Sequence, residues 1–365
     1  MPEDMPVVPE MFEGIGYTRD QNGLPLQAVA VPVPKPGPGE ILIHVACSSL
    51  NPLEYKLAEL NFFGRTPPVI LGFDLSGIVA AVGPGVSRFA VGDAVAAMAD
   101  SNGDGGWATG GHGGYALAKE FYAARKPASL SFQEAAALPL CFIAAYLGLH
   151  GHVQRGDTVY IPGGGGGVGH LAVQLARNIF GAGSVISSGS TVESASLARA
   201  CGADHVFNYK YDDVGGEVMK LTGGKGLDVI YDATYSERSF VDTARMVRHG
   251  GSWIVLGVGP GKTTRKTETN SPVAALLAER RAKLINVNML RYFSEPTLLD
   301  ASAQEFFRNA LQSAMTWAVD RRVRPHIGKV IDASVAAVNA ELAAMKLGTS
   351  TIGKTVVIVD RARGR

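Results

Sequence analysis

The sequence predicts a two-domain α/β protein, in which a strand-rich domain is joined to a doubly wound parallel sheet with helices. The chain has 365 residues, which is too long for one ordinary domain. Up to Ser131 it reads as short apolar strands separated by Gly and Pro. After Ser131, strands alternate with helices, and this alternation is typical of parallel βαβ units.

The N-terminal part supplies the strands of the first domain. Residues 41–47 read as a buried strand after a turn rich in Pro and Gly, and residues 77–83 and 93–98 read as two more. We expect turns rather than helices between them, because Gly, Pro and Asn recur there. The glycine-rich stretch 99–114 is expected to be a long surface loop.

The second part begins with a helix start signal. Ser131 and Glu134 have the spacing of a capping box. The strands expected after it cover residues 158–162, 184–188, 205–208, 228–232 and 252–257. The expected helices cover 168–180, 194–201 and 239–248, and the C-terminal segment adds helices at 303–319 and 335–345 and a strand at 354–359.

Composition excludes several classes of function. Only 18% of residues are charged and the net charge is +1, so we expect no nucleic-acid partner and no membrane surface. The three cysteines, Cys47, Cys141 and Cys201, are far apart and lack the CxxC spacing of a metal site or a disulfide framework. The N-terminus has no signal-peptide pattern, and the apolar runs are too short to span a bilayer. We therefore expect a cytoplasmic protein.

The most informative motif is a glycine-rich turn between a strand and a helix. Residues 163–167 are five consecutive glycines, and Gly164, Gly166 and Gly169 match the GxGxxG pattern. Such glycines permit a tight turn, close approach of the backbone to a pyrophosphate, and close packing of helix on strand. Together with Gly167 and Val168, they are the predicted phosphate site at the helix N-terminus.

The end of the next strand indicates which dinucleotide binds. NAD sites usually carry an acidic residue there to hold the ribose 2′-OH, whereas this turn reads Ser-Ser-Gly-Ser-Thr over 187–191. A hydroxyl can bind a 2′-phosphate that a carboxylate would repel, so Ser188 favours NADPH. No Arg or Lys lies at this turn, and Glu193 follows closely.

Motifs spread along the chain resemble the quinone-oxidoreductase, zeta-crystallin-like branch of the medium-chain dehydrogenase/reductase superfamily. They include Asn-Pro-Leu-Glu at 51–54, Leu-Gly-Phe-Asp-Leu-Ser-Gly at 71–77, Val-Gly-Asp-Ala-Val at 91–95, Gly-Ala-Asp-His-Val-Phe-Asn-Tyr at 202–209, and Gly-Lys at 353–354. The resemblance implies a GroES-like β-barrel domain over residues 1–138 and 299–365, and a Rossmann domain over 139–298. It also implies an active site in the cleft between them and a homodimer.

The resemblance also identifies what this chain lacks. Alcohol dehydrogenases of the superfamily hold a catalytic zinc on a Cys and a His, and the matching positions here are Asn51 and Phe73. Neither is a normal zinc ligand, and Cys47 falls four residues too early. We therefore expect no metal, and without this Lewis acid simple alcohol oxidation is not expected.

The resemblance further implies residues near the nicotinamide. Asn51 is a neutral hydrogen-bond donor at a position where relatives place a group near the nicotinamide. Tyr55 and Lys56 follow it in a pattern similar to the Asn-Pro-x-Asp-x-Lys motif of some enone and enoyl reductases. Tyr209 matches a position beside the adenosine phosphate, and Gly257 and Val258 match a loop bordering the nicotinamide. Each also has a plain structural interpretation: Asn51 as a turn residue, Lys56 as a solvated side chain, Tyr209 as sheet-edge packing, and Gly257 as a turn.

These observations predict an NADPH-dependent, zinc-independent reductase of a small quinone or an activated, carbonyl-conjugated double bond. Two alternatives stay open. One is a trans-acting enoyl reductase of a polyketide or acyl-thioester pathway, and the other is a non-catalytic NADPH-binding structural or RNA-associated protein. The sequence does not identify the acceptor, the proton donor or the electron count of quinone reduction.

Overall fold

The computed structural model describes residues 8–18, 23–61, 64–99, 109–234, 240–257, 272–289, 292 and 299–364. The chain forms two compact units. The first contains Met1–Leu140, Phe293–Arg321 and Pro325–Arg365, and the second contains Cys141–Tyr292 and Arg322–Arg324. The first unit is thus assembled from both ends of the chain.

Two sheets build the first unit. The smaller has the order β2(Gln27–Pro32)–β1(Met11–Tyr17)–β4(Val69–Ile70) and is antiparallel. The larger has the order β15(Ile327–Asp332)–β16(Lys354–Ile358)–β3(Glu40–Ser49)–β5(Asp74–Val82)–β6(Ala94–Met98)–β8(Ala123–Arg125), with β7(Tyr115–Lys119) also on β3. In it, the C-terminal β16 pairs antiparallel with β3, so that Val356 faces Ser49.

Strand β3 lies at the centre of the larger sheet, where it pairs with β16, β5 and β7, and nearly all of it is buried. Its apolar side chains, among them Ile41, Ile43 and Val45, are inaccessible and pack with Leu75 and Val79 of β5. The strand is apolar from Ile41 to Cys47 except at His44, which is half-buried, as suits a strand that is buried on both faces. Cys47 is fully buried on the same strand, as expected of a small core residue.

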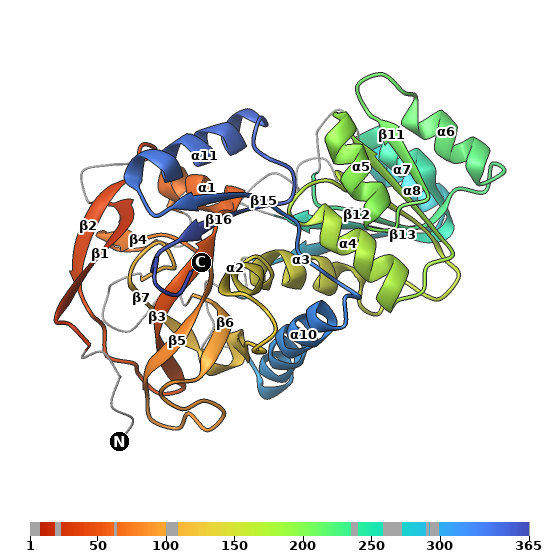
Figure 1. Ribbon diagram of the computed structural model, residues 1–365. Helices are drawn as coiled ribbons and strands as arrows, with labels where there is room; N and C mark the ends of the chain where they lie inside the picture. The colour runs from red at the N-terminus through yellow and green to blue at the C-terminus, as the bar shows by residue number, and fades with distance from the viewer. Residues whose placement is uncertain are drawn as a thin grey trace. The chain divides into compact units, whose positions relative to one another are not determined.

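Helices close the first unit, and polar caps start most of them. The predicted capping box is confirmed in α2(Phe132–Ala136), where Glu134 N donates to Ser131 Oγ at 3.1 Å and Ser131 N donates to Glu134 Oε2 at 3.0 Å. Asp300 caps α10(Ala301–Val319) and Ser334 caps α11(Val335–Leu347) by a single bond each, in which the side chain accepts from the N–H of Ala303 and Ala337, respectively. Figure 1 shows α11 beside α1(Pro52–Leu60), which it contacts.

The second unit contains a parallel sheet, as predicted, with one strand more than the five expected from the sequence. Its order is β11(His205–Asn208)–β10(Ser184–Gly189)–β9(Thr158–Pro162)–β12(Leu227–Asp232)–β13(Val247–Gly257)–β14(Lys283–Asn288). This is the doubly wound order of a dinucleotide-binding fold. The accompanying helices are α3(Pro139–Leu149), α4(Gly169–Gln174) with its π-helical continuation Leu175–Ile179, α5(Val192–Ala200), α6(Val214–Leu221), α7(Phe240–Met246) and α8(Pro272–Glu279).

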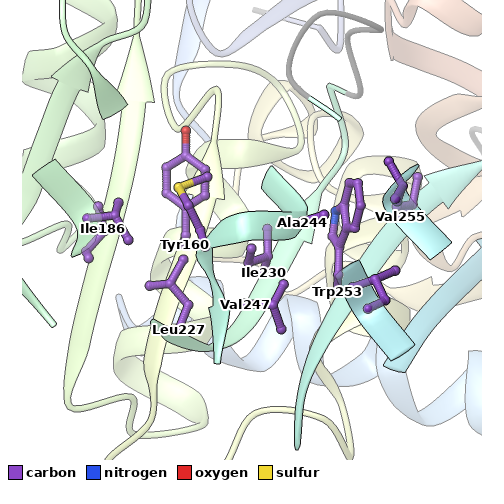
Figure 2. Packing of buried hydrophobic residues seen from close by; sticks show 12 residues of the cluster. Tyr160, Ile186, Leu227, Ile230, Ala244, Val247, Trp253 and Val255 are labelled. Atoms are coloured by element: carbon purple, nitrogen blue, oxygen red, sulfur yellow. The ribbon is translucent and has the colours of Figure 1, made fainter. Parts of the chain in front are cut away.

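The core of this unit lies where side chains of neighbouring strands meet helix side chains. Figure 2 shows Tyr160, Ile230 and Trp253 from β9, β12 and β13 with Ala244 of α7. Trp253 is fully buried, and truncating such a side chain to Ala costs about 3–5 kcal/mol.

Several elements differ from the sequence prediction. The predicted helix 239–248 ends at Met246, because Val247 already pairs with Leu227 as part of β13. A helix, α1, stands where turns were expected, since Pro52 at its start supplies a helical φ and leaves no N–H unsatisfied. The sequence prediction also omitted α6, α8, β14 and β15.

The predicted surface loop 99–114 is only partly within the described residues. Its last part, from Thr109 onward, is not on the surface: Thr109 and His112 are both buried, because Gly113 pairs with Gly14 of β1. Among the helices that the structure describes, none is both long and apolar enough to cross a bilayer.

Candidate functional site

The glycine-rich turn lies at the carboxyl edge of the parallel sheet. It follows β9 and leads into α4, and the N–H groups of Gly163 and Gly164 donate to Ser188 O at 3.0 and 3.2 Å. Because β9 lies between β10 and β12, the turn is at the point where the strand order reverses. Open α/β sheets bind ligands at this point.

Close contacts explain why glycine is needed here. A Cβ on Gly164 would lie 2.2 Å from Ser187 Oγ, and one on Gly169 would lie 2.1 Å from Gly163 O. Gly166 is exposed, and Gly167 and Val168 are half-buried, so the start of α4 is accessible to a ligand. The turn therefore fits the pyrophosphate of a dinucleotide, which would bind at the helix N-terminus.

The end of β10 has hydroxyls and no carboxylate over residues 187–191. Ser188 is buried, and its Oγ accepts a hydrogen bond from Tyr160 OH at 3.0 Å. Ser190 is half-buried one residue beyond the strand. The first acidic residue is Glu193, fully exposed in the first turn of α5. Ser188 thus lies at the predicted strand end, with its hydroxyl bonded within the sheet.

The end of β11 lies beside the end of β10. Tyr209 N donates to Gly189 O at 3.3 Å, and the Tyr209 side chain is 56% exposed. Lys210 follows it and is also exposed. Lys210 was not predicted from the sequence, because a cation after β11 becomes relevant only when β11 is seen to lie beside β10.

The third predicted part of the dinucleotide site is the end of β13. Gly257 is the last residue of that strand and is in parallel register with Asn288 of β14. Gly257 therefore lies at the same carboxyl edge as the glycine-rich turn, two strands away. Val258 lies outside the described residues.

In the first unit, Asn51 belongs to a buried network around Lys354. The Lys354 ammonium donates to Asn51 Oδ1 at 2.7 Å, to Asp74 Oδ2 at 3.1 Å and to Leu50 O at 3.1 Å. Asn51 Nδ2 donates to Asp74 Oδ2 at 2.9 Å. Ser49 Oγ and Leu140 N donate to the same carboxylate, and all these side chains are buried. The network fixes which way the Asn51 amide faces.

Glu54 adds a second buried carboxyl group to this region. It accepts hydrogen bonds from Asn51 N at 2.5 Å and from Phe73 N at 3.3 Å. Glu54 therefore links the two residues that the family resemblance aligns with zinc ligands. Burial raises the pKa of Glu54 to about 7, the Lys354 ammonium opposes that rise, and the Asp74 carboxylate adds to it. Glu54 therefore exchanges its proton near neutral pH.

Tyr55 and Lys56 lie on α1, one turn after Asn51, and both are half-buried. Burial raises the pKa of the Tyr55 hydroxyl, Glu59 raises it further, and Lys346 opposes the rise. Lys346 of α11 pairs with Glu59 of α1, so Tyr55 lies close to the charges that join these helices. The structure thus brings Asn51 into the Lys354 network and Tyr55 near the α1–α11 ion pair.

Comparison with known proteins identifies the family. Residues 37–128 match the model of the alcohol dehydrogenase GroES-like domain, and residues 167–314 match the model described as zinc-binding dehydrogenase. A quinone oxidoreductase of Pongo abelii is 33% identical over 239 residues, which cover 64% of this chain and 69% of that protein. The chain belongs to the quinone-oxidoreductase branch of the medium-chain dehydrogenase/reductase superfamily.

Other members of the superfamily are similar over comparable lengths. A 2-methylene-furan-3-one reductase of Solanum lycopersicum is 34% identical over 62% of this chain, which spans 57% of that relative. An NADPH-dependent alkenal/one oxidoreductase of Arabidopsis thaliana is 30% identical over 60% of the chain and 55% of that relative. An alcohol dehydrogenase superfamily protein from Novosphingobium aromaticivorans has a TM-score of 0.80 at 29% identity, covering 96% of this chain and 100% of the other. The GroES-like and Rossmann fold classes predicted from the sequence are therefore confirmed.

Because many members of this superfamily bind zinc, the residues around Asn51 and Phe73 bear on whether a metal could bind there. Within the described ranges, no group of three or more His, Cys, Asp or Glu side chains has a metal-binding arrangement. His112 is buried nearby, and its Nδ1 lies 2.8 Å from Ser48 Oγ. Burial, together with the nearby Lys354 ammonium, lowers the pKa of His112 to about 3, so this imidazole is neutral at ordinary pH.

Proposed function

We propose that this superfamily member is an NADPH-dependent reductase that transfers hydride, without zinc, to a quinone or to a double bond conjugated to a carbonyl. The observation that carries the proposal is the Lys354 ammonium 2.7 Å from Asn51 Oδ1. The positive charge of Lys354 therefore contacts the Asn51 side chain, which occupies the position of a metal ligand in zinc-dependent relatives.

Electrostatics explains why this arrangement disfavours a metal. A divalent cation bound at Asn51 would be repelled by the buried ammonium, since like charges interact strongly where water is excluded. Asn51 Oδ1 already accepts from Lys354, and Phe73 offers only a hydrocarbon ring. Without a Lewis acid, the acceptor must already be activated, as quinones and enones are.

The proposed cofactor preference rests on the ends of β10 and β11. A carboxylate at the end of β10 would repel a 2′-phosphate, and the residues from Ser187 to Thr191 carry none. Ser188 and Tyr209 are the proposed hydroxyl ligands, and the exposed Lys210 adds a cation directly after Tyr209 in the sequence. The similarity to an NADPH-dependent alkenal/one oxidoreductase agrees with this preference.

We assign the remaining residues by the same reasoning. NADPH would supply hydride when bound, held by the glycine-rich turn, with Gly257 and Val258 bordering its nicotinamide. Asn51, Tyr55 and Lys56 would border the acceptor and the nicotinamide, and stabilise charge on the acceptor oxygen. The domain boundaries after residues 138 and 298, the homodimer and the cytoplasmic location are further parts of this proposal.

A panel of acceptors tests the reaction. NADPH oxidation would be followed with benzoquinone, a 2-enone, a 2-enal and an enoyl thioester, and we expect turnover with the first three. Turnover with the enoyl thioester alone would favour an acyl-thioester reductase. NADPH binding without turnover of any acceptor would favour a structural protein.

A substitution tests the assignment of Lys56. Losing a donor to developing charge costs about 10²–10³ in turnover, and a quinone needs less help because its reduced form is delocalised. Lys56→Ala should therefore slow enone reduction more than quinone reduction. The control is Lys220→Ala, which removes an exposed lysine from the other unit. Equal rates for Lys56→Ala and the control with both acceptors would assign Lys56 a structural role.

A further inference from the structure

An open cavity lies in the first unit, between α10 and the segment that follows β7. It is lined by Pro38 and Gly39, by the three residues from Lys119 to Phe121, and by Gln304 and Arg308 of α10. All of these residues belong to the first unit. The volume of the cavity is about 250 Å³. Pockets for drug-sized ligands have about 300–1,000 Å³, so this cavity has room for a smaller organic molecule.

Helix α10 supplies the polar wall of the cavity. Gln304 and Arg308 are four residues apart, so they lie on the same face of the helix, one turn from each other. Phe307, next to Arg308, is buried and meets the Tyr122 ring edge-on, with 5.1 Å between the ring centroids. Because Tyr122 ends the short helix that begins at Glu120, this contact fixes α10 against the opposite wall.

Arg308 brings a positive charge to this wall. Its side chain is half-buried, and its Nε is shielded from solvent without a hydrogen-bond partner. Within the part of the chain that the structure describes, no carboxylate forms an ion pair with the Arg308 guanidinium. A buried donor that lacks an acceptor costs free energy, so an anion bound to this guanidinium would be stabilising.

Arg88 adds a second cation close to the first. It is half-buried, and its Nη1 donates to the backbone carbonyl of Glu120 at 3.2 Å. Burial lowers the pKa of Arg88, the Arg308 charge lowers it further, Glu120 opposes this change, and Arg125 adds to it. The two guanidinium groups therefore repel each other. Arg125 is already compensated, because it pairs with Asp93 at 2.6 Å.

The acidic groups around the cavity do not balance both cations. Glu40 pairs with Lys119 at 2.7 Å. Glu120 Oε1 accepts hydrogen bonds from Ser87 N at 2.9 Å and from Arg88 N at 2.5 Å. Glu120 is thus one carboxylate for two guanidinium groups, and one positive charge is left over. Like charges repel more strongly where water is partly excluded, so this charge favours an anion in the cavity.

We propose that the cavity is a binding site for a small organic anion, whose phosphate or carboxylate group binds Arg308 and whose apolar part packs on Phe121 and Pro38. A guanidinium presents paired N–H donors that match the oxygen atoms of both groups, and Arg88 attracts the same charge. None of these residues is assigned to the reductase reaction, so the site does not depend on the proposed function.

A titration followed by nuclear magnetic resonance locates the ligand. The side-chain Nε–H signal of Arg308, in protein with isotope-labelled arginine, is identified by its absence from Arg308→Met. Phenyl phosphate and benzoate carry the two groups on the same apolar ring, and phenol is the neutral control. We expect a saturable shift with at least one of the anions and none with phenol, and the tighter-binding anion identifies the group. A signal that neither anion moves, or that phenol moves equally, would overturn the proposal.

Calorimetry with the same anions measures what Arg308 contributes to the affinity. Arg308→Met should raise the Kd by about tenfold or more, since a hydrogen bond to a charged group is lost. Arg308→Lys should raise it less, because it keeps the charge but not the planar fork. The matched control is Arg361→Met, which removes an exposed arginine of the same unit and lowers the net charge equally. Equal affinities in Arg308→Met and Arg361→Met, with normal circular dichroism, would reject the site.

Discussion

Replacing Lys354 by Met tests the buried ion pair on which the argument against a metal rests. Met keeps most of the length of the lysine side chain but removes the ammonium and its bonds to Leu50, Asn51 and Asp74. Asp74 is fully buried, so it would be left as an uncompensated charge. Breaking one partner of a buried pair typically costs about 3–5 kcal/mol.

The structure places the expected cost at the lower end of that range. Asp74 keeps its donors from Ser49, Asn51 and Leu140 after Lys354 is lost, so we expect about 3 kcal/mol. Adding Asp74→Asn should restore at least about 1 kcal/mol, because it removes the unpaired charge. The Asn51 amide can then reverse, since its oxygen no longer faces an ammonium.

Hydrogen exchange provides a readout for each unit. Opening free energies of amides in β3 and β16 should fall in Lys354→Met, while those in β9 and β10 of the other unit should not. Lys346→Met is the control, because its ion pair with Glu59 has side chains 53% and 29% exposed and is worth less than about 1 kcal/mol. A loss in Lys354→Met no larger than in this control, or a double variant as unstable as the sum of its parts, would refute the reasoning.

Three further predictions concern metal, cofactor and pH. The purified protein should hold no stoichiometric zinc, and chelators should leave turnover unchanged; elemental analysis showing one zinc per chain, with activity lost on removal, would contradict this. Ser188→Ala and Tyr209→Phe should each weaken the binding of NADPH by about tenfold or more, because each removes a hydrogen bond to the charged 2′-phosphate. The binding of NADH, which lacks this phosphate, should not change. Equal losses of affinity for both nucleotides would count against the assignment. Burial raises the pKa of Glu54 to about 7, above the ordinary value of 4.5, so the folded chain retains a proton that the unfolded chain loses. The free energy of unfolding should therefore decrease as the pH rises between these two values. Glu54→Gln should abolish that decrease, on the order of 3 kcal/mol, in urea unfolding measured across this pH range, and a variant with the wild-type slope would exclude Glu54 as its origin.

What the sequence determined by itself is the part of the molecule that local patterns encode. Five glycines after an apolar strand predict a tight turn, and the structure has that turn at the carboxyl edge of the sheet. The alternation of strands and helices predicted the parallel sheet, since each element buries a periodic apolar face. Ser131 and Glu134 predicted a cap because both partners lie within one helical turn.

Only the tertiary structure decided what surrounds the candidate acceptor site. Lys354 is 303 residues from Asn51 in the chain and 2.7 Å from it in space, and no local pattern indicates that pairing. The Gly-Lys motif was recognised in the sequence, but its ion pair with Asp74 requires β16 to lie against β3. Burial depends on such long-range contacts, and it is burial that brings the pKa of Glu54 near neutrality.

Arg65 illustrates the same limit. In the sequence it is one arginine in a short loop, where the expected state is an exposed, solvated side chain. In the fold, the Asn61 side chain accepts a hydrogen bond from Arg65 N, and the Arg65 guanidinium lies over the Phe73 ring. Arg65 is therefore a buried charge that lines a small cavity. The chain order supplies the residues that line this cavity, but their neighbours, and therefore their chemistry, depend on which strands and loops pack together.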